Sequence, residues 1–194
     1  MVCGLSSKNE GFTLVELLIS IAIFSIVLGS IFSFSIAQRR YLSVQEQISR
    51  MIQTARSVMD MISSEISIAG YSPSGAIFSG IPYDISQLQI YADLNGNGVL
   101  TDPSENIIYS YDAGNKRILR NTGGGNQPLA DNVQSFAFDY LNAQGNPTTV
   151  TANIRQIRIT ITVRTSKPDP KYTANSGYRT YTLISLVTPR NLAY

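Results

Sequence analysis

Residues 11–20 read GFTLVELLIS and open the apolar run that decides the fold. The run extends from Phe12 to Ala37. As a helix that rises about 1.5 Å per residue, it is long enough to cross a bilayer. One acidic residue, Glu16, lies inside it. A carboxylate beside hydrocarbon is costly unless something neutralises it, so Glu16 needs a partner.

The helical pattern continues beyond the apolar run. No proline occurs before Pro73, and Gly70 is a suitable C-terminal stop. The sequence therefore predicts one helix from Phe12 to Ala69, apolar on all sides in its first half and amphipathic in its second. The apolar face of the second half consists of Val44, Ile48, Met51, Ile52, Ala55, Val58, Met59, Ile62 and Ile66. We also expect Met51, Met59 and Met61 to fill gaps in a core.

After Gly70 the pattern changes to alternating residues separated by turns, which predicts strands. The expected strands are residues 88–92, 106–112, 117–120, 133–141, 154–165 and 178–187, and residues 74–84 and 121–127 are expected to be loops. Phe136, Phe138 and Tyr140 share one face of their strand. These features predict an α+β fold, in which an antiparallel sheet packs on the amphipathic half of the long helix.

The composition excludes several kinds of function. The chain contains no histidine, and its single cysteine, Cys3, precedes the apolar run. No serine and lysine, and no two carboxylates, are spaced in a way that indicates a catalytic site. The glycines Gly123–Gly125 are not followed by the Lys-Ser/Thr of a phosphate-binding loop. We therefore expect no enzyme. The net charge of +2 does not indicate nucleic acid, and arginines such as Arg158 on alternating strand positions indicate a solvated face.

Residues 93–98, DLNGNG, match the start of a calcium loop. Hard cations are bound by oxygen atoms at alternating positions, and a glycine permits the sharp turn. The usual twelfth ligand is missing, because Ser104 occupies that position. Asn/Asp/Gly clusters also form plain turns between strands, so both interpretations stay open. The candidate ligands are Asp93, Asn95, Asn97, Val99 through its carbonyl, Thr101, Asp102 and Glu105; calcium is the one cofactor that the sequence suggests.

The junction before the apolar run resembles the processing site of type IV prepilins and type II secretion pseudopilins. A plain signal anchor explains neither Glu16 nor Gly11-Phe12. The resemblance implies that prepilin peptidase cleaves between Gly11 and Phe12 and methylates the new N-terminus at Phe12. It also implies that Glu16 forms a salt bridge with the amine of a neighbouring subunit during assembly. The expected parts are a leader (1–11), a membrane and filament-core helix half (12–37), an amphipathic helix half (38–70) and a β-rich pilin domain (71–194).

Longer segments are most similar to PilW-type minor pilins and next to J-type minor pseudopilins. They are residues 55–71, 129–140, 154–159 and 188–192. The resemblance implies a type IV pilin-like fold and a minor pilin that helps to initiate pilus assembly at or near the tip. Two alternatives are a minor pseudopilin of a type II secretion system and a tip module that binds DNA or a surface.

The resemblance also implies partners and a location. The partners are major and minor pilins, prepilin peptidase, the inner-membrane assembly platform and, before assembly, membrane lipid; nucleic acid is not expected. The chain should cross the bacterial inner membrane once, with its soluble domain outside the cytoplasm, and then enter the pilus.

Overall fold

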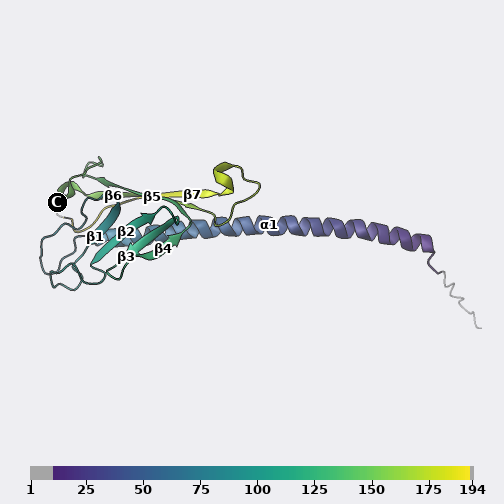
Figure 1. The fold of residues 1–194 in the computed structure, drawn as a ribbon, viewed down its shortest axis with the longest axis horizontal. Coiled ribbons are helices and arrows are strands. Elements are labelled where there is room, and N and C mark those ends of the chain that lie inside the picture. The colour runs from purple at the N-terminus through teal and green to yellow at the C-terminus, as the bar shows by residue number, and fades with distance from the viewer. Residues whose placement is uncertain (1–10, 193–194) are drawn as a thin grey trace, which may run out of the picture. The chain divides into compact units, whose positions relative to one another are not determined.

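A computed structural model describes residues 11–192 of the chain. These residues contain one α-helix, α1 (Leu14–Ser67), together with seven strands and two short 3-10 helices (Figure 1). The chain divides into two compact units between Gln45 and Glu46, and α1 contributes residues to both. The helix ends before Gly70, whose φ of 77° lies in the left-handed region that glycine adopts without strain.

The first sheet has four antiparallel strands in the order β1-β2-β3-β4. They are β1 (Gln87–Tyr91), β2 (Asn106–Asp112), β3 (Arg117–Asn121) and β4 (Gln127–Asp131). Residues 113–116 form the turn between β2 and β3, which pair from Ile108↔Asn121 to Asp112↔Arg117. Strand β4 contains Pro128 and lies at the edge of the sheet, where a missing backbone N–H is tolerated.

The second sheet has three antiparallel strands in the order β5-β6-β7. They are β5 (Val133–Leu141), β6 (Gln156–Arg164) and β7 (Thr180–Val187). The alternation of β6 sorts its side chains as expected, because its four apolar residues are buried and its arginines and threonines are not. The buried set is Ile157, Ile159, Ile161 and Val163.

One core joins the second half of α1 to both sheets. It takes Ile62 and Ile66 from the helix, Ile90 and Tyr109 from the first sheet, and Ile159 from the second. The predicted α+β fold is therefore confirmed, with the helix packed on antiparallel strands.

Three details of the prediction are wrong. The strands form two sheets rather than one. Strand β4 was not expected, because the consecutive glycines within residues 121–127 indicate a loop and no strand was predicted before Val133. Met61 is not a core residue, since 42% of its surface is exposed, whereas Met51 and Met59 are buried as expected.

The end of α1 meets a loop and the C-terminal segment at two close backbone approaches. A Cβ on Gly80 would lie 2.4 Å from the backbone nitrogen of Gly70. A Cβ on Gly70 would lie 2.8 Å from the carbonyl oxygen of Asn191. Any larger residue at either position therefore requires the backbone to move.

Candidate functional site

The predicted cleavage junction is sterically open. Phe12 is 88% exposed, and a Cβ placed on Gly11 would have no neighbouring atom within 4 Å. Within the part of the chain that the structure describes, this junction precedes the first residue of α1, so its backbone is not committed to the helix. Cys3 and the rest of the leader before Gly11 lie outside the described residues.

Glu16 forms a capping box with Thr13 at the start of α1. One carboxylate oxygen of Glu16 accepts hydrogen bonds from the backbone N–H and the hydroxyl of Thr13, both at 2.9 Å. In return, the Glu16 N–H donates to the Thr13 hydroxyl oxygen at 3.3 Å. This reciprocal arrangement satisfies donors that the first helical turn leaves unpaired. Sequence reasoning did not assign a role to Thr13, although the Thr-x-x-Glu spacing could have revealed it.

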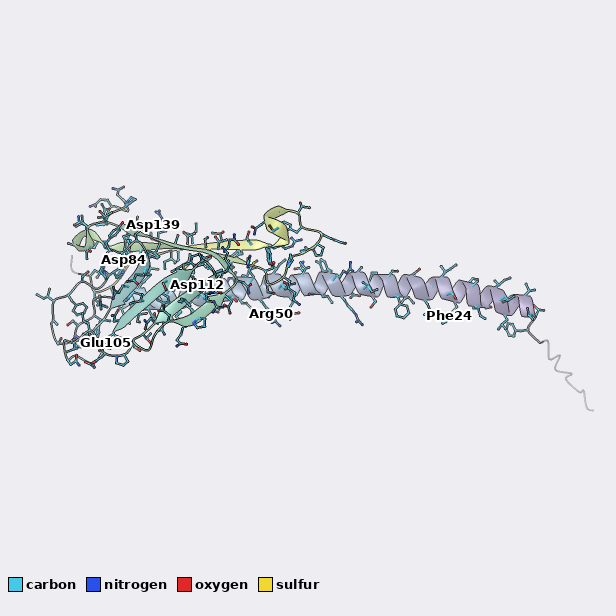
Figure 2. All side chains as sticks on the ribbon, viewed as in Figure 1. Phe24, Arg50, Asp84, Glu105, Asp112 and Asp139 are labelled. Atoms are coloured by element: carbon cyan, nitrogen blue, oxygen red, sulfur yellow. The ribbon has the colours of Figure 1, made fainter. Side chains whose placement is uncertain are left out.

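The first half of α1 presents an apolar surface that nothing in its own unit covers. Every Phe, Leu, Ile and Val side chain from Phe12 to Ile36 is exposed, and Figure 2 shows Phe24 projecting away from the helix. The helix is long and apolar enough to cross a membrane. Four serines in this segment each donate their hydroxyl to the carbonyl oxygen of an earlier residue: Ser20 to Glu16, Ser25 to Ile21, Ser30 to Ile26 and Ser33 to Gly29. These hydroxyls therefore need no water.

The loop between β1 and β2 gathers the remaining predicted site residues. Asp93 is fully buried and accepts hydrogen bonds from the Ser74 hydroxyl (2.6 Å) and from the backbone N–H groups of Gly96 (2.8 Å) and Gly98 (3.2 Å). The Ser74 hydrogen bond, supported by the two backbone donors, lowers the pKa of Asp93 although burial opposes this. Ser74 was missed because it lies 19 residues before Asp93.

Glu105 closes the loop from its other end. Its Oε1 accepts the backbone N–H groups of Leu94 (2.8 Å) and Asn95 (2.9 Å), and the residue is only 2% exposed. Asp102 is half-buried, and its Oδ2 accepts from the side-chain amides of Asn95 and Asn97, each at 2.8 Å. Val99 and Thr101 are exposed. The structure thus brings all three acids to one loop, where Asp93 and Glu105 accept backbone N–H groups and Asp102 accepts side-chain amides.

Comparison with known proteins addresses both parts of the chain. Residues 6–32 match the prokaryotic N-terminal methylation motif. Residues 44–181, more than half of the chain, match the family of prepilin peptidase-dependent protein B. The chain belongs to this family.

A solved structure supports the same conclusion for the fold. The type IV-like pilin from Thermus thermophilus is similar, with a TM-score of 0.50 and 13% sequence identity, over 74% of this chain and 99% of that chain. A sequence comparison with curated proteins gives no match. The chain is therefore a type IV pilin-like protein dependent on prepilin peptidase, in a fold family that is structural and generally not enzymatic. Its apolar N-terminal helix indicates membrane anchoring.

Two further features of this family member were not predicted. Glu65 on α1 accepts hydrogen bonds from the Tyr109 hydroxyl and from Arg120, whose Nη2 lies 2.6 Å from Glu65 Oε1. Burial and the Glu65 hydrogen bond raise the pKa of Tyr109, and Glu65 also raises that of Arg120. These residues are 44 and 55 positions apart from Glu65, so no local pattern could have revealed the cluster.

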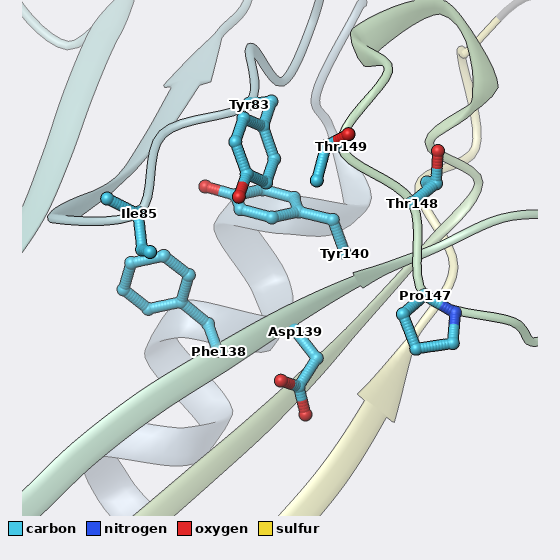
Figure 3. Close-up of a pocket in the computed structure, with 8 residues that line it drawn as sticks. All are labelled: Tyr83, Ile85, Phe138, Asp139, Tyr140, Pro147, Thr148 and Thr149. Atoms are coloured by element: carbon cyan, nitrogen blue, oxygen red, sulfur yellow. The ribbon is translucent and has the colours of Figure 1, made fainter.

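The second feature is an open hollow of about 350 Å³ beside β5. Tyr83 packs against Tyr140 with ring centroids 5.2 Å apart, and Phe138 lies 5.7 Å from Tyr140. Figure 3 shows Ile85 beside the Phe138 ring and Asp139 directed away from the aromatic rings. The carboxylate of Asp139 lies 3.7 Å from Arg158. The hollow is therefore lined by both aromatic and polar side chains, and its Asp139 carboxylate already has a cationic partner.

Proposed function

We propose that this protein is a minor type IV pilin of the PilW type, which helps to initiate pilus assembly at or near the tip. The observation that carries the proposal is an N-terminal methylation motif on an exposed apolar helix with a single acid, attached to a pilin fold. The similarity of residues 55–71, 129–140 and 188–192 to PilW-type minor pilins supports the specific role.

Prepilin peptidase, in this proposal, removes residues 1–11 and methylates Phe12. Residues 12–37 then cross the inner membrane, the domain formed by residues 71–194 lies outside the cytoplasm, and lipid covers the exposed apolar side chains. Neighbouring major and minor pilins replace that lipid when the assembly platform inserts the subunit into a filament. The open Gly11-Phe12 junction supports the cleavage step, and the exposed apolar surface supports the contacts with lipid and with neighbouring pilins.

Glu16 has a second role after cleavage. The new amine at Phe12 is positive, and burial in a filament makes a nearby carboxylate favourable, because an unpaired charge in an apolar layer is costly. The Glu16 carboxylate of one subunit then neutralises the Phe12 amine of its neighbour. Only one of its oxygens takes part in the hydrogen bonds to Thr13, which leaves the other available.

The test separates the charge of Glu16 from its capping function. Glutamine also completes a capping box, so Glu16→Gln keeps the cap and removes the charge. Glu16→Ala removes both, and Thr13→Ala weakens the cap while it retains the charge. We expect the two Glu16 variants to be cleaved and methylated normally, as measured by mass spectrometry of the membrane fraction, and to enter sheared pili at least about tenfold less than wild type.

Thr13→Ala should enter pili at close to the wild-type level. If Glu16→Gln is incorporated like wild type, the charge pairing is wrong. If all three variants are incorporated poorly to the same extent, the cap rather than the charge is what assembly requires.

The structure gives no support to a nucleic-acid-binding role. Of the arginines that could meet phosphates, Arg158 pairs with Asp139, and Arg179 lies 2.8 Å from Asp169. Arg164 stacks over the Tyr178 ring, 4.4 Å from its centroid. Because Arg158 and Arg179 already pair with carboxylates, a phosphate would have to compete with those carboxylates.

A further inference from the structure

The Asp93 loop, residues 93–105, contains two buried carboxylates with no cation to balance them. Asp93 is 0% exposed and Glu105 is 2% exposed. Among residues 11–192, neither forms a salt bridge with a lysine or arginine. The loop itself contains three acids and no basic residue. Burying charge without a counter-charge is strongly unfavourable, so a cation from outside the loop would stabilise these two carboxylates.

The position of one carboxylate oxygen, Glu105 Oε2, indicates where that cation would bind. Glu105 Oε2 is buried and has no hydrogen-bond donor within the described residues. The other oxygen of the same carboxylate accepts from Leu94 and Asn95, so the group is directed into the first turn of the loop. A buried acceptor is rarely left unsatisfied in a folded protein, and a bound water or cation commonly satisfies one that has no protein donor.

The neighbouring oxygen atoms are those that a hard cation prefers. The side-chain oxygens of Asn95 and Asn97 each accept one backbone N–H two residues further on and keep a second lone pair. The Val99 carbonyl follows at the seventh position, after Gly98, whose φ is 74°. Asp102 holds the amide nitrogens of both asparagines and so fixes how their oxygens are turned. Acids, amides and a carbonyl at alternating positions are a calcium ligand set.

The same residues disfavour other metals. Within residues 11–192, no three acidic, histidine or cysteine side chains form a metal-binding group, so an ion in this loop would need amide and carbonyl oxygens beside its carboxylates. Zinc and other transition metals require nitrogen, sulfur or several carboxylate ligands. Magnesium demands a small and regular octahedron and usually keeps several water ligands, whereas calcium accepts many amide and carbonyl oxygens.

We infer that the Asp93 loop binds one Ca²⁺, with Asp93 and Glu105 as its charged ligands and Asn95, Asn97 and the Val99 carbonyl as neutral ones. Glu105 serves as the acid that Ser104 cannot supply, one residue later than in the usual loop. Because Asp93 also donates its N–H to the Tyr71 carbonyl and accepts from Ser74, the ion would fasten the segment that follows α1.

The test uses the full chain in detergent micelles after removal of divalent ions with a chelator. Calorimetric titration should give one Ca²⁺ per chain with a dissociation constant of about 0.1–1 mM, typical of extracellular calcium modules. Calcium at about 10 mM should raise Tm by about 3–10 °C, and excess chelator should reverse the rise. Glu105→Gln and Asp93→Asn should abolish the heat of binding and the Tm shift.

Asp112→Asn is the matched control, because Asp112 holds the β2–β3 turn through two hydrogen bonds to Asn115 and lies outside the loop. It should bind calcium like wild type. The inference is overturned if the wild-type chain shows neither heat nor a Tm shift with calcium, whatever the variants do. It is equally overturned if magnesium gives the same shift, or if Asp112→Asn loses binding as Glu105→Gln does.

Discussion

Residues 14–45 and residues 46–67 of α1 belong to one helix and differ in what surrounds their apolar side chains. In the first segment every large apolar side chain up to Ile36 is exposed. In the second, six residues on one stripe are buried in a core shared with two sheets. The apolar stripe of the second segment is covered by the two sheets of the same chain. The all-round apolar surface of residues 14–36 is not covered within its own unit, and an exposed apolar surface of this kind marks a site of contact with a membrane or another protein.

The largest expected effect on the free energy of unfolding is the difference between an isoleucine-to-alanine substitution in the second segment and the same substitution in the first. Ile62 is 0% exposed and Ile26 is 71% exposed. Ile62→Ala opens a cavity and should lower the free energy of unfolding by about 2–5 kcal/mol. Ile26→Ala should change it by no more than about 0.5 kcal/mol. Urea unfolding of the full chain in micelles, followed by tyrosine fluorescence, measures both, and equal losses would mean that the first segment is also packed.

A smaller difference in the free energy of unfolding is expected between two ion pairs that the second segment forms. The Arg120–Glu65 and Arg50–Glu46 pairs have nearly equal N–O distances, 2.6 and 2.7 Å. Their exposure differs, because the Glu65 side chain is 16% exposed and the Glu46 side chain 62%. Arg120→Ala leaves a part-buried carboxylate with one donor and should cost about 1–3 kcal/mol. Arg50→Ala should cost less than about 0.5 kcal/mol. The same unfolding assay compares them, and similar costs would show that burial does not set the strength of these pairs.

The smallest effect is a pH dependence in the sheet that covers the buried segment. Tyr140 is 4% exposed and donates its hydroxyl to the Asp84 carbonyl at 2.9 Å. Burial raises the pKa of Tyr140 to about 12. Above about pH 10 the unfolded chain loses this proton first, so the folded state loses stability as pH rises from about 10 to 12.

Tyr140→Phe removes one hydrogen bond and should lower stability by about 1 kcal/mol near pH 8. The variant should also lose stability less steeply above about pH 10, because it has one titrating group fewer. Urea midpoints measured from about pH 8 to 11 test this, and parallel profiles of the two proteins would contradict it.

Sequence patterns predicted the features that depend on near neighbours. The helix was expected over residues 12–69 and observed as Leu14–Ser67, and β2 and β5 begin and end where their alternation does. Periodicity is local, so it identifies an element and its buried face. The two-sheet arrangement and β4 depend instead on which distant strands pair, and Pro128 indicates no strand by itself.

The same limit applies to the candidate sites. Glu16 and Gly11 could be selected from their spacing, and Thr13 could have been. The acidic residues of the Asp93 loop could also be selected from the sequence motif. That Glu105 turns its carboxylate back onto Leu94 and Asn95 depends on backbone geometry, as does the meeting of Glu65 with Arg120.

Four of the five serines between Phe12 and Ile36 donate to an acceptor in the same helix, the carbonyl one turn earlier. These four hydroxyls therefore stay hydrogen-bonded in any apolar surroundings. Moving residues 17–34 from one apolar medium to another breaks none of these hydrogen bonds. Glu16 in the first turn, by contrast, carries a charge, and the cost of that charge depends on what lies next to it.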